Sequence, residues 1–110
     1  MLYAVLQSER FGLDMDNEFN AGDIVFSKKG RDSGRYYIVM RVEDNYAYIC
    51  DGDLHKTEKP KKKKLKHLKH TACSSEHIKD GLSEGRMFQN AELRRAIAEF
   101  RAQNAENSSE

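Results

Sequence analysis

The pattern of hydrophobic residues becomes regular only near residue 22. Before it, a short apolar run at the N-terminus fits one turn of helix or a short strand equally well, and residues 14–20 are polar. Met15 stands just ahead of the first well-patterned segment, which leaves open whether Met1 or Met15 is the true start. We therefore treat residues 1–19 as an N-terminal extension and expect it to be unstructured.

From Gly22 onward the sequence favours short strands. Ile24–Phe26 is a β-branched and aromatic run between Gly22 and the Lys-Lys-Gly that follows, and it predicts a strand. Arg35–Val42 and Tyr46–Cys50 predict two more, joined by a two-residue Asp-Asn turn. Leu54–Glu58 and Leu65–Leu68 complete a set of short strands with tight turns. Such a set predicts a small curled β-barrel over residues 20–72.

The period changes from two to about 3.6 after Thr71. Ser74 or Ser75 can cap a short helix that ends at Gly85, although Gly81 lies inside it. A longer helix follows, with Asn90 as the expected cap and apolar residues recurring at i, i+4 and i+7. We predict a helical segment over residues 73–104 and a disordered tail over 105–110. The expected fold class is mostly β with C-terminal α.

The composition is that of a small domain without a disulfide scaffold or a membrane span. Hydrophobic residues make up 38% and charged residues 34% of the 110 residues, a surface-rich balance for one small domain. Cys50 and Cys73 are too few for a disulfide scaffold and indicate a reducing compartment. No stretch has the ~20 apolar residues of a membrane span, and the N-terminus has no basic region of a signal peptide. We expect a cytoplasmic protein with no membrane partner.

The small net charge of +1 conceals a strong asymmetry along the chain. Residues 1–23 carry −4, residues 24–50 carry +2, residues 51–70 carry +5 and residues 71–110 carry −2. A cationic middle between anionic ends indicates a polyanionic partner.

Two segments supply this charge. The first, the basic loop Lys28–Arg35, has glycines that let the backbone approach a phosphate and expose N–H donors. The second, the lysine run Lys56–Lys69, is tied to the domain by Leu65 and Leu68, so we expect it beside the basic loop. An ordinary basic hairpin and a solvated charge run are the alternatives. The candidate RNA-binding residues are Lys28, Lys29, Gly30, Arg31, Gly34, Arg35, Lys56, Lys59, Lys61, Lys62, Lys63, Lys64, Lys66, His67 and Lys69.

Residues 22–39 resemble the KOW motif, a strand, a Gly-containing basic loop and a second strand found in SH3-like barrels of ribosomal proteins and NusG-type transcription factors. The wider order of elements over about residues 20–100 resembles bacterial KOW-domain RNA-binding proteins, which are similar to large-subunit ribosomal protein fourteen of archaea and eukaryotes. The resemblance implies an SH3-like barrel that binds structured RNA, ribosomal RNA included, on or near the large ribosomal subunit. The matching motif positions are Gly22, Val25, Gly30, Arg31, Asp32, Gly34, Arg35 and Val39.

The resemblance leaves a second function open: a transcription elongation or antitermination module whose KOW barrel binds polymerase. Many ribosomal members have an arginine-richer basic segment, and lysines suit phosphates better than base edges. Base stacking on a tyrosine is a further expectation, with Tyr36 or Tyr37 as the candidate and barrel packing as the role of most tyrosines.

Other chemistries are disfavoured. His67, His70, Cys73 and His77 lie close in sequence but lack the paired spacing of a structural zinc site. No nucleophile elbow, phosphate-binding Gly-Lys-Ser/Thr loop or His-Glu-x-x-His motif is present. We expect no catalytic residues, metal, cofactor or small-molecule substrate.

Overall fold

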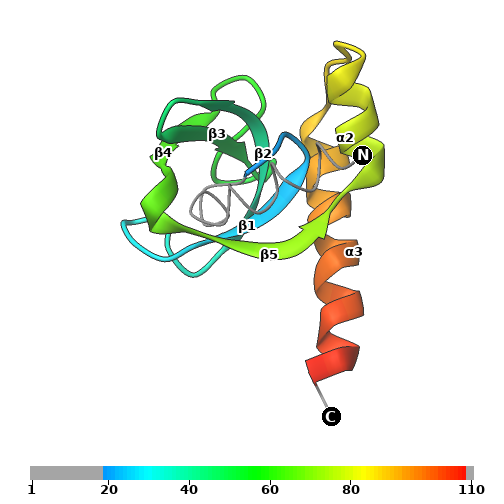
Figure 1. The fold of residues 1–110 in the computed structure, drawn as a ribbon. Helices are drawn as coiled ribbons and strands as arrows, with labels where there is room; N and C mark the ends of the chain where they lie inside the picture. Colours follow the sequence, from blue (N-terminus) through cyan, green and yellow to red (C-terminus); the bar gives the residue numbers. More distant parts are fainter. Residues whose placement is uncertain (1–18, 109–110) are drawn as a thin grey trace, which may run out of the picture.

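The computed structural model describes residues 19–108, and the side chains of that range up to residue 104. Residues 1–18, which include both candidate starts, and residues 109–110 lie outside the described part. Five strands and a C-terminal helical region follow one another, so the mostly β fold class with C-terminal α is confirmed (Figure 1). The elements are β1 (Asp23–Ser27), β2 (Tyr36–Glu43), β3 (Tyr46–Cys50), β4 (Lys61–Lys64), the 3₁₀ helix η2 (Leu65–His67), β5 (Leu68–Ser74), α2 (Glu76–Ser83) and α3 (Asn90–Ser108).

The strands form one antiparallel sheet in the order β4-β3-β2-β1-β5. Its two edge strands, β4 and β5, are consecutive in sequence and are joined by the three residues of η2. The edges of a flat five-stranded sheet lie ~19 Å apart, whereas so short a 3₁₀ helix spans roughly 6–8 Å. The sheet is therefore strongly curled, as Figure 1 shows. Within the described residues β4 pairs with β3 and β5 with β1, so the sheet stays open.

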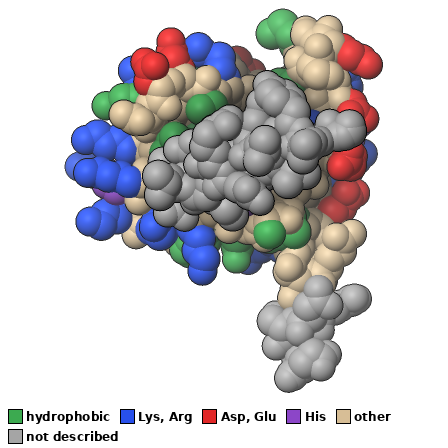
Figure 2. All heavy atoms as spheres, in the orientation of Figure 1, with side chains coloured by type: hydrophobic (Ala, Val, Ile, Leu, Met, Phe, Trp, Pro, Cys, Tyr) green, Lys and Arg blue, Asp and Glu red, His purple; other side chains and the backbone are tan. Residues whose placement is uncertain are grey.

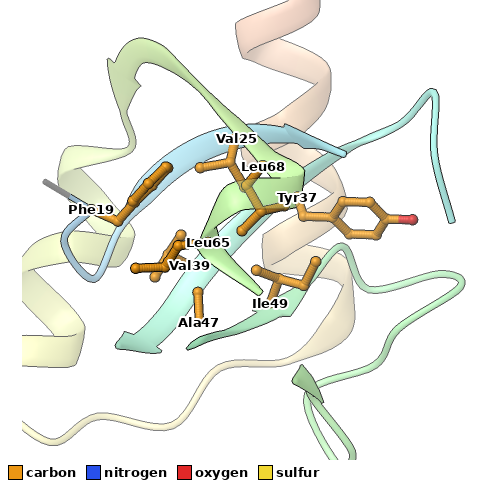
Figure 3. Packing of buried hydrophobic residues seen from close by; sticks show 8 residues of the cluster. All are labelled: Phe19, Val25, Tyr37, Val39, Ala47, Ile49, Leu65 and Leu68. Atoms are coloured by element: carbon orange, nitrogen blue, oxygen red, sulfur yellow. The ribbon is translucent and has the colours of Figure 1, made fainter. Parts of the chain in front are cut away.

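Both faces of the sheet are covered, which follows from the alternation of side chains along each strand. Val25, Val39 and Ile49 point into the curl and pack with Leu65 and Leu68, the two leucines of the lysine run (Figure 3). Their neighbours Ile24 and Ile38 point outward. This outer face packs against the helices in a second buried cluster with Cys50, Ile78, Phe88, Leu93, Ile97 and Phe100.

The helix ends follow the expected signals with one exception. Ser75 caps α2 by accepting a hydrogen bond from the N–H of Ile78 at 3.3 Å, and Gly85 follows its end with φ 78°. The prediction that Asn90 caps the second helix is wrong. At that end the carboxylate of Glu92 accepts from the N–H of Gln89 at 3.1 Å. Asn90 instead accepts from the N–H of Thr57 at 2.8 Å and so holds the 51–60 loop against α3.

Two strand predictions were misplaced. Leu54–Glu58 forms turns, and its preceding Gly52, at φ 79°, passes so close to the carbonyl of Asn90 that a Cβ would lie 2.3 Å from that oxygen. Leu65–Leu68 is not a strand but η2 followed by the first residue of β5. The strand is instead Lys61–Lys64, whose four lysines have a low strand propensity that pairing with β3 outweighs.

The domain boundaries shift by a few residues. Phe19, assigned to the N-terminal extension, is buried in the cluster inside the curl. Strand β5 runs past residue 72 to Ser74, and α3 extends past residue 104 to Ser108. In the described part of the chain, no helix is both long and apolar enough to cross a membrane.

Candidate nucleic-acid interface

The basic loop connects β1 to β2 and is closed by its own backbone. Gly34 donates to the carbonyl of Ser27 at 2.9 Å, and Ser33 donates to the carbonyl of Gly30 at 3.1 Å. Gly30 has φ 94°, a conformation that other residues rarely adopt. This tight course leaves Lys28, Lys29 and Arg31 exposed on the outside of the loop.

Asp32 is the buried centre of the loop. One carboxylate oxygen accepts from the Ser27 hydroxyl at 3.1 Å and from the Lys63 ammonium, and the other lies 3.2 Å from His55 Nε2. Burial alone would raise the pKa of Asp32, but the hydrogen bonds from Lys63, Ser27 and His55 outweigh it and hold the pKa below its usual value. The carboxylate therefore stays charged and fixes three segments of the chain around one point.

Lys63 joins the lysine run to the basic loop. Besides its ion pair with Asp32, its ammonium donates to the carbonyl of Lys29 at 2.6 Å. A second bond joins the same two segments, from the N–H of Lys28 to the carbonyl of His67 at 2.9 Å. The basic loop and the lysine run are thus side by side, as the sequence predicted, and the edge strand β4 carries four of the run's lysines.

The exposed cations gather around this junction. Figure 2 shows lysine and arginine side chains at the side of the sheet away from the helices, with acidic side chains along the helices opposite. Desolvation lowers the pKa of His67, and the positive charges of Lys29, Lys66, Lys63 and Lys64 lower it further. The exposed members of the predicted set within residues 28–34 and 61–69 are Lys28, Lys29, Gly30, Arg31, Gly34, Lys61, Lys62, Lys64, Lys66 and Lys69.

Two predicted contact residues are instead engaged within the protein. Arg35 donates to Asp51 at 3.2 Å and to Asp53 at 2.8 Å, so its charge is already compensated. Lys63 is buried against Asp32. Both therefore position the loop, and we remove them from the set of phosphate contacts.

Lys56 and Lys59 lie in the loop that precedes β4. With Leu54, His55, Pro60 and Lys61 they line a groove of about 450 Å³. The Lys56 ammonium donates to the carbonyl of Asp53 at 3.1 Å.

The tyrosines predicted to stack on bases serve the fold. Tyr37 is fully buried, and its hydroxyl donates to the carbonyl of Asp32 at 3.0 Å. Tyr36 lies between the rings of Phe26 and Phe100, with centroids 5.1 and 5.0 Å away. Tyr46 and Tyr48 on β3 are partly exposed, as Tyr36 is, and they lie beside the lysines of β4. Sequence reasoning missed them because it did not pair these two strands.

The histidines and cysteines that lie close in sequence do not converge on one site. His70 lies 2.8 Å from a carboxylate oxygen of Asp23, and His77 lies 3.1 Å from Glu92. Burial raises the pKa of the Cys50 thiol to about 12. Across residues 19–108, no group of three or more His, Cys, Asp or Glu side chains is arranged to hold a metal ion.

No protein-family model matches this chain, and no curated protein matches it.

Proposed function

We propose that this chain is an RNA-binding protein that holds structured RNA through phosphate contacts. The observation that carries the proposal is the junction of the basic loop and the lysine run. It places exposed cations from β1–β2, β4, η2 and β5 on one side of the sheet, and Lys63 fixes the two segments together. Exposed lysines at that density suit a polyanion, because each phosphate that they neutralise releases counterions.

The fold supports a KOW domain in an SH3-like barrel. The supporting features are the strongly curled sheet, the glycine-containing basic loop between β1 and β2 and the one-turn η2 between the edge strands. On this proposal the RNA target is ribosomal RNA or another folded RNA, and the site of action is at or near the large ribosomal subunit. Lysines contribute affinity with little choice of base, so the shape of the loop has to supply the selectivity.

The test is the salt dependence of binding to a folded RNA. We expect log K to fall linearly with log salt, with a slope of roughly 0.7–0.9 for each phosphate contact. Replacing Lys61, Lys62 and Lys64 together by glutamine should reduce both the affinity and the slope. The control is Lys79→Gln with Arg95→Gln, which removes two exposed charges from the helices and should leave both the affinity and the slope unchanged. A flat salt dependence in the wild-type protein excludes the mechanism.

Charge reversal separates this proposal from a polymerase-binding transcription module. Lys→Glu at the same three lysines should abolish RNA binding if the junction is the RNA site. Association with polymerase in a pull-down, unaffected by the reversal and present without RNA, would favour the transcription module instead.

A further inference from the structure

A hollow opens at the turn end of the β2–β3 hairpin, beside the lysines of the proposed interface. It has a volume of about 400 Å³ and is lined by Asn45, Tyr46, Lys64, Leu65 and Lys66. That volume lies in the range of small-molecule sites. Its walls combine an aromatic ring, a side-chain amide and two ammonium groups.

The pairing of strands explains how these residues meet. Tyr46 is the first residue of β3 and lies directly opposite Lys64 on β4. The backbone N–H of Leu65 donates to the carbonyl of Asn45 at 2.9 Å, which holds the start of η2 against the hairpin turn. Leu65 is buried and gives the hollow an apolar floor.

The two tyrosines of this face are held differently. The Cζ atom of the Arg41 guanidinium lies over the Tyr48 ring, 4.1 Å from the ring centroid. The Tyr48 hydroxyl donates to the Glu43 carboxylate at 3.1 Å. Tyr46 has a lysine as its ring partner, with Lys62 Nζ 4.5 Å from the ring centroid. The ammonium is on a flexible stem, and a cation–π contact at a partly exposed ring is weaker than base–aromatic stacking. Tyr46 can therefore exchange its cation for a base, whereas the bonds to Glu43 keep Tyr48 in place.

We propose that this hollow holds one unpaired nucleotide of the bound RNA. The base stacks on Tyr46, the Asn45 amide meets the edge of the base, and Lys64 and Lys66 contact the flanking phosphates. This inference rests on the proposed function and sharpens it, because the preferred RNA then carries an unstacked nucleotide in a loop or bulge and is not a continuous duplex. Single-stranded loops are where proteins find bases free to stack on aromatic side chains.

The experiment compares two RNAs of matched length and charge, one with a bulged 2-aminopurine and one with the same base paired. The wild-type protein should bind the bulged RNA more tightly and quench its fluorescence. Tyr46→Leu should weaken binding to the bulged RNA by roughly 5- to 150-fold, the usual contribution of one stacked base. It should leave the salt slope unchanged because no charge is lost, and Tyr46→Phe should bind as the wild type does.

Tyr48→Leu is the matched control from the same strand and face, and it should change the affinity little. Circular dichroism and the unfolding midpoint of each variant establish that it is folded. Equal affinity for the two RNAs, or equal loss in the two leucine variants, would overturn the inference while the salt-dependent RNA binding still stood. Salt-independent binding of both RNAs would instead overturn the proposed function itself.

A final arm distinguishes RNA from a free nucleotide. Adenosine monophosphate is titrated into the wild-type protein and into Tyr46→Leu. Binding of the free nucleotide as tight as that of the bulged RNA, with the same dependence on Tyr46, would assign the hollow to a small ligand and overturn its role in RNA binding. Weak or undetectable binding of the mononucleotide supports the RNA assignment.

Discussion

At the scale of single residues, Asp32 and Lys63 organise the proposed interface. A buried ion pair often contributes little net stability, because desolvation offsets the attraction between the charges. Here the pair does something more specific, since Lys63 also bonds to the carbonyl of Lys29 and thereby fixes where the basic loop lies. The ion pair sets the position of the basic loop. A large loss of stability is expected only when one partner is removed and the other charge is left buried.

Removing Lys63 should therefore destabilise the protein far more than removing a neighbouring lysine. Lys63→Ala leaves the buried Asp32 carboxylate without its ammonium partner and should lower the free energy of unfolding by about 3 kcal/mol. Lys64→Ala, at an exposed position of the same strand, should change it by no more than about 0.5 kcal/mol. Urea denaturation measures both.

The double variant Lys63→Met with Asp32→Asn is the companion test. It removes both charges, so its loss should be smaller than that of Lys63→Ala alone. If Lys63→Ala lowered the free energy of unfolding no more than Lys64→Ala does, the assignment of Lys63 to a buried ion pair would be contradicted.

At the scale of elements, α2 shows a conflict between local propensity and packing. Gly81 is unfavourable inside a helix, and alanine there would ordinarily stabilise the helix by about 1 kcal/mol. In this fold Gly81 is buried against the ring of Phe88, and an added Cβ would lie 2.3 Å from the tip of that ring. The ring is itself buried and cannot move aside freely.

We therefore expect Gly81→Ala to destabilise the protein. Overpacking a well-filled core costs about 1–3 kcal/mol, which exceeds the gain in helix propensity. Thermal unfolding followed by circular dichroism gives the sign. Combining Gly81→Ala with Phe88→Leu makes room for the Cβ, so the double variant should be more stable than the sum of the two single effects predicts. A rise in stability for Gly81→Ala alone would show that Phe88 does not pack as described.

The elements that the sequence predicted well are those whose local signals agree with their packing. The Asp-Asn turn between β2 and β3 is one case, because the turn residues and the flanking strands indicate the same hairpin. The apolar spacing of α3 is another, and Leu93, Ile97 and Phe100 are all buried as expected. The adjacency of the basic loop and the lysine run also followed from the two leucines that anchor the run.

The rest depended on contacts between residues that are distant in sequence. Four lysines in a row give no signal for a strand, and only the pairing with β3 makes Lys61–Lys64 one. Without that register, Lys63 could not be distinguished from its exposed neighbours, and Tyr46 could not be placed beside Lys64. Arg35 could not be recognised as compensated, because Asp51 and Asp53 reach it only through the fold.

At the scale of the whole molecule, the charged end of the sheet is separate from the face that packs against the helices. The end that carries β4 and η2 presents cations, while the outer face under α2 and α3 supplies the second buried cluster. Two fully buried titratable groups are members of the hydrophobic clusters. Cys50 lies in the cluster under the helices, and Tyr37 lies in the cluster inside the curl.

These two groups make the fold sensitive to alkali. Burial raises the pKa of Cys50 from 9.0 to about 12 and the pKa of Tyr37 from 10.0 to about 12. Above pH 9 the unfolded chain therefore loses protons that the folded protein retains, and stability must fall as the pH rises. We expect the urea midpoint to decrease progressively between pH 9 and 12 under reducing conditions.

Variants assign the loss to each group. Cys50→Ala should flatten the part of the curve that begins at pH 9, and Tyr37→Phe the part that begins at pH 10, although each lowers the midpoint at neutral pH by removing a buried contact. Cys73→Ala is the control for loss of a thiol outside these fully buried positions. A midpoint that stays constant from pH 8 to pH 12 in the wild-type protein would mean that neither group is held in the interior. Cys50 and Tyr37 lie in different clusters. If urea unfolds the protein in one cooperative transition at every pH, and both groups contribute to its pH dependence, the two clusters unfold together.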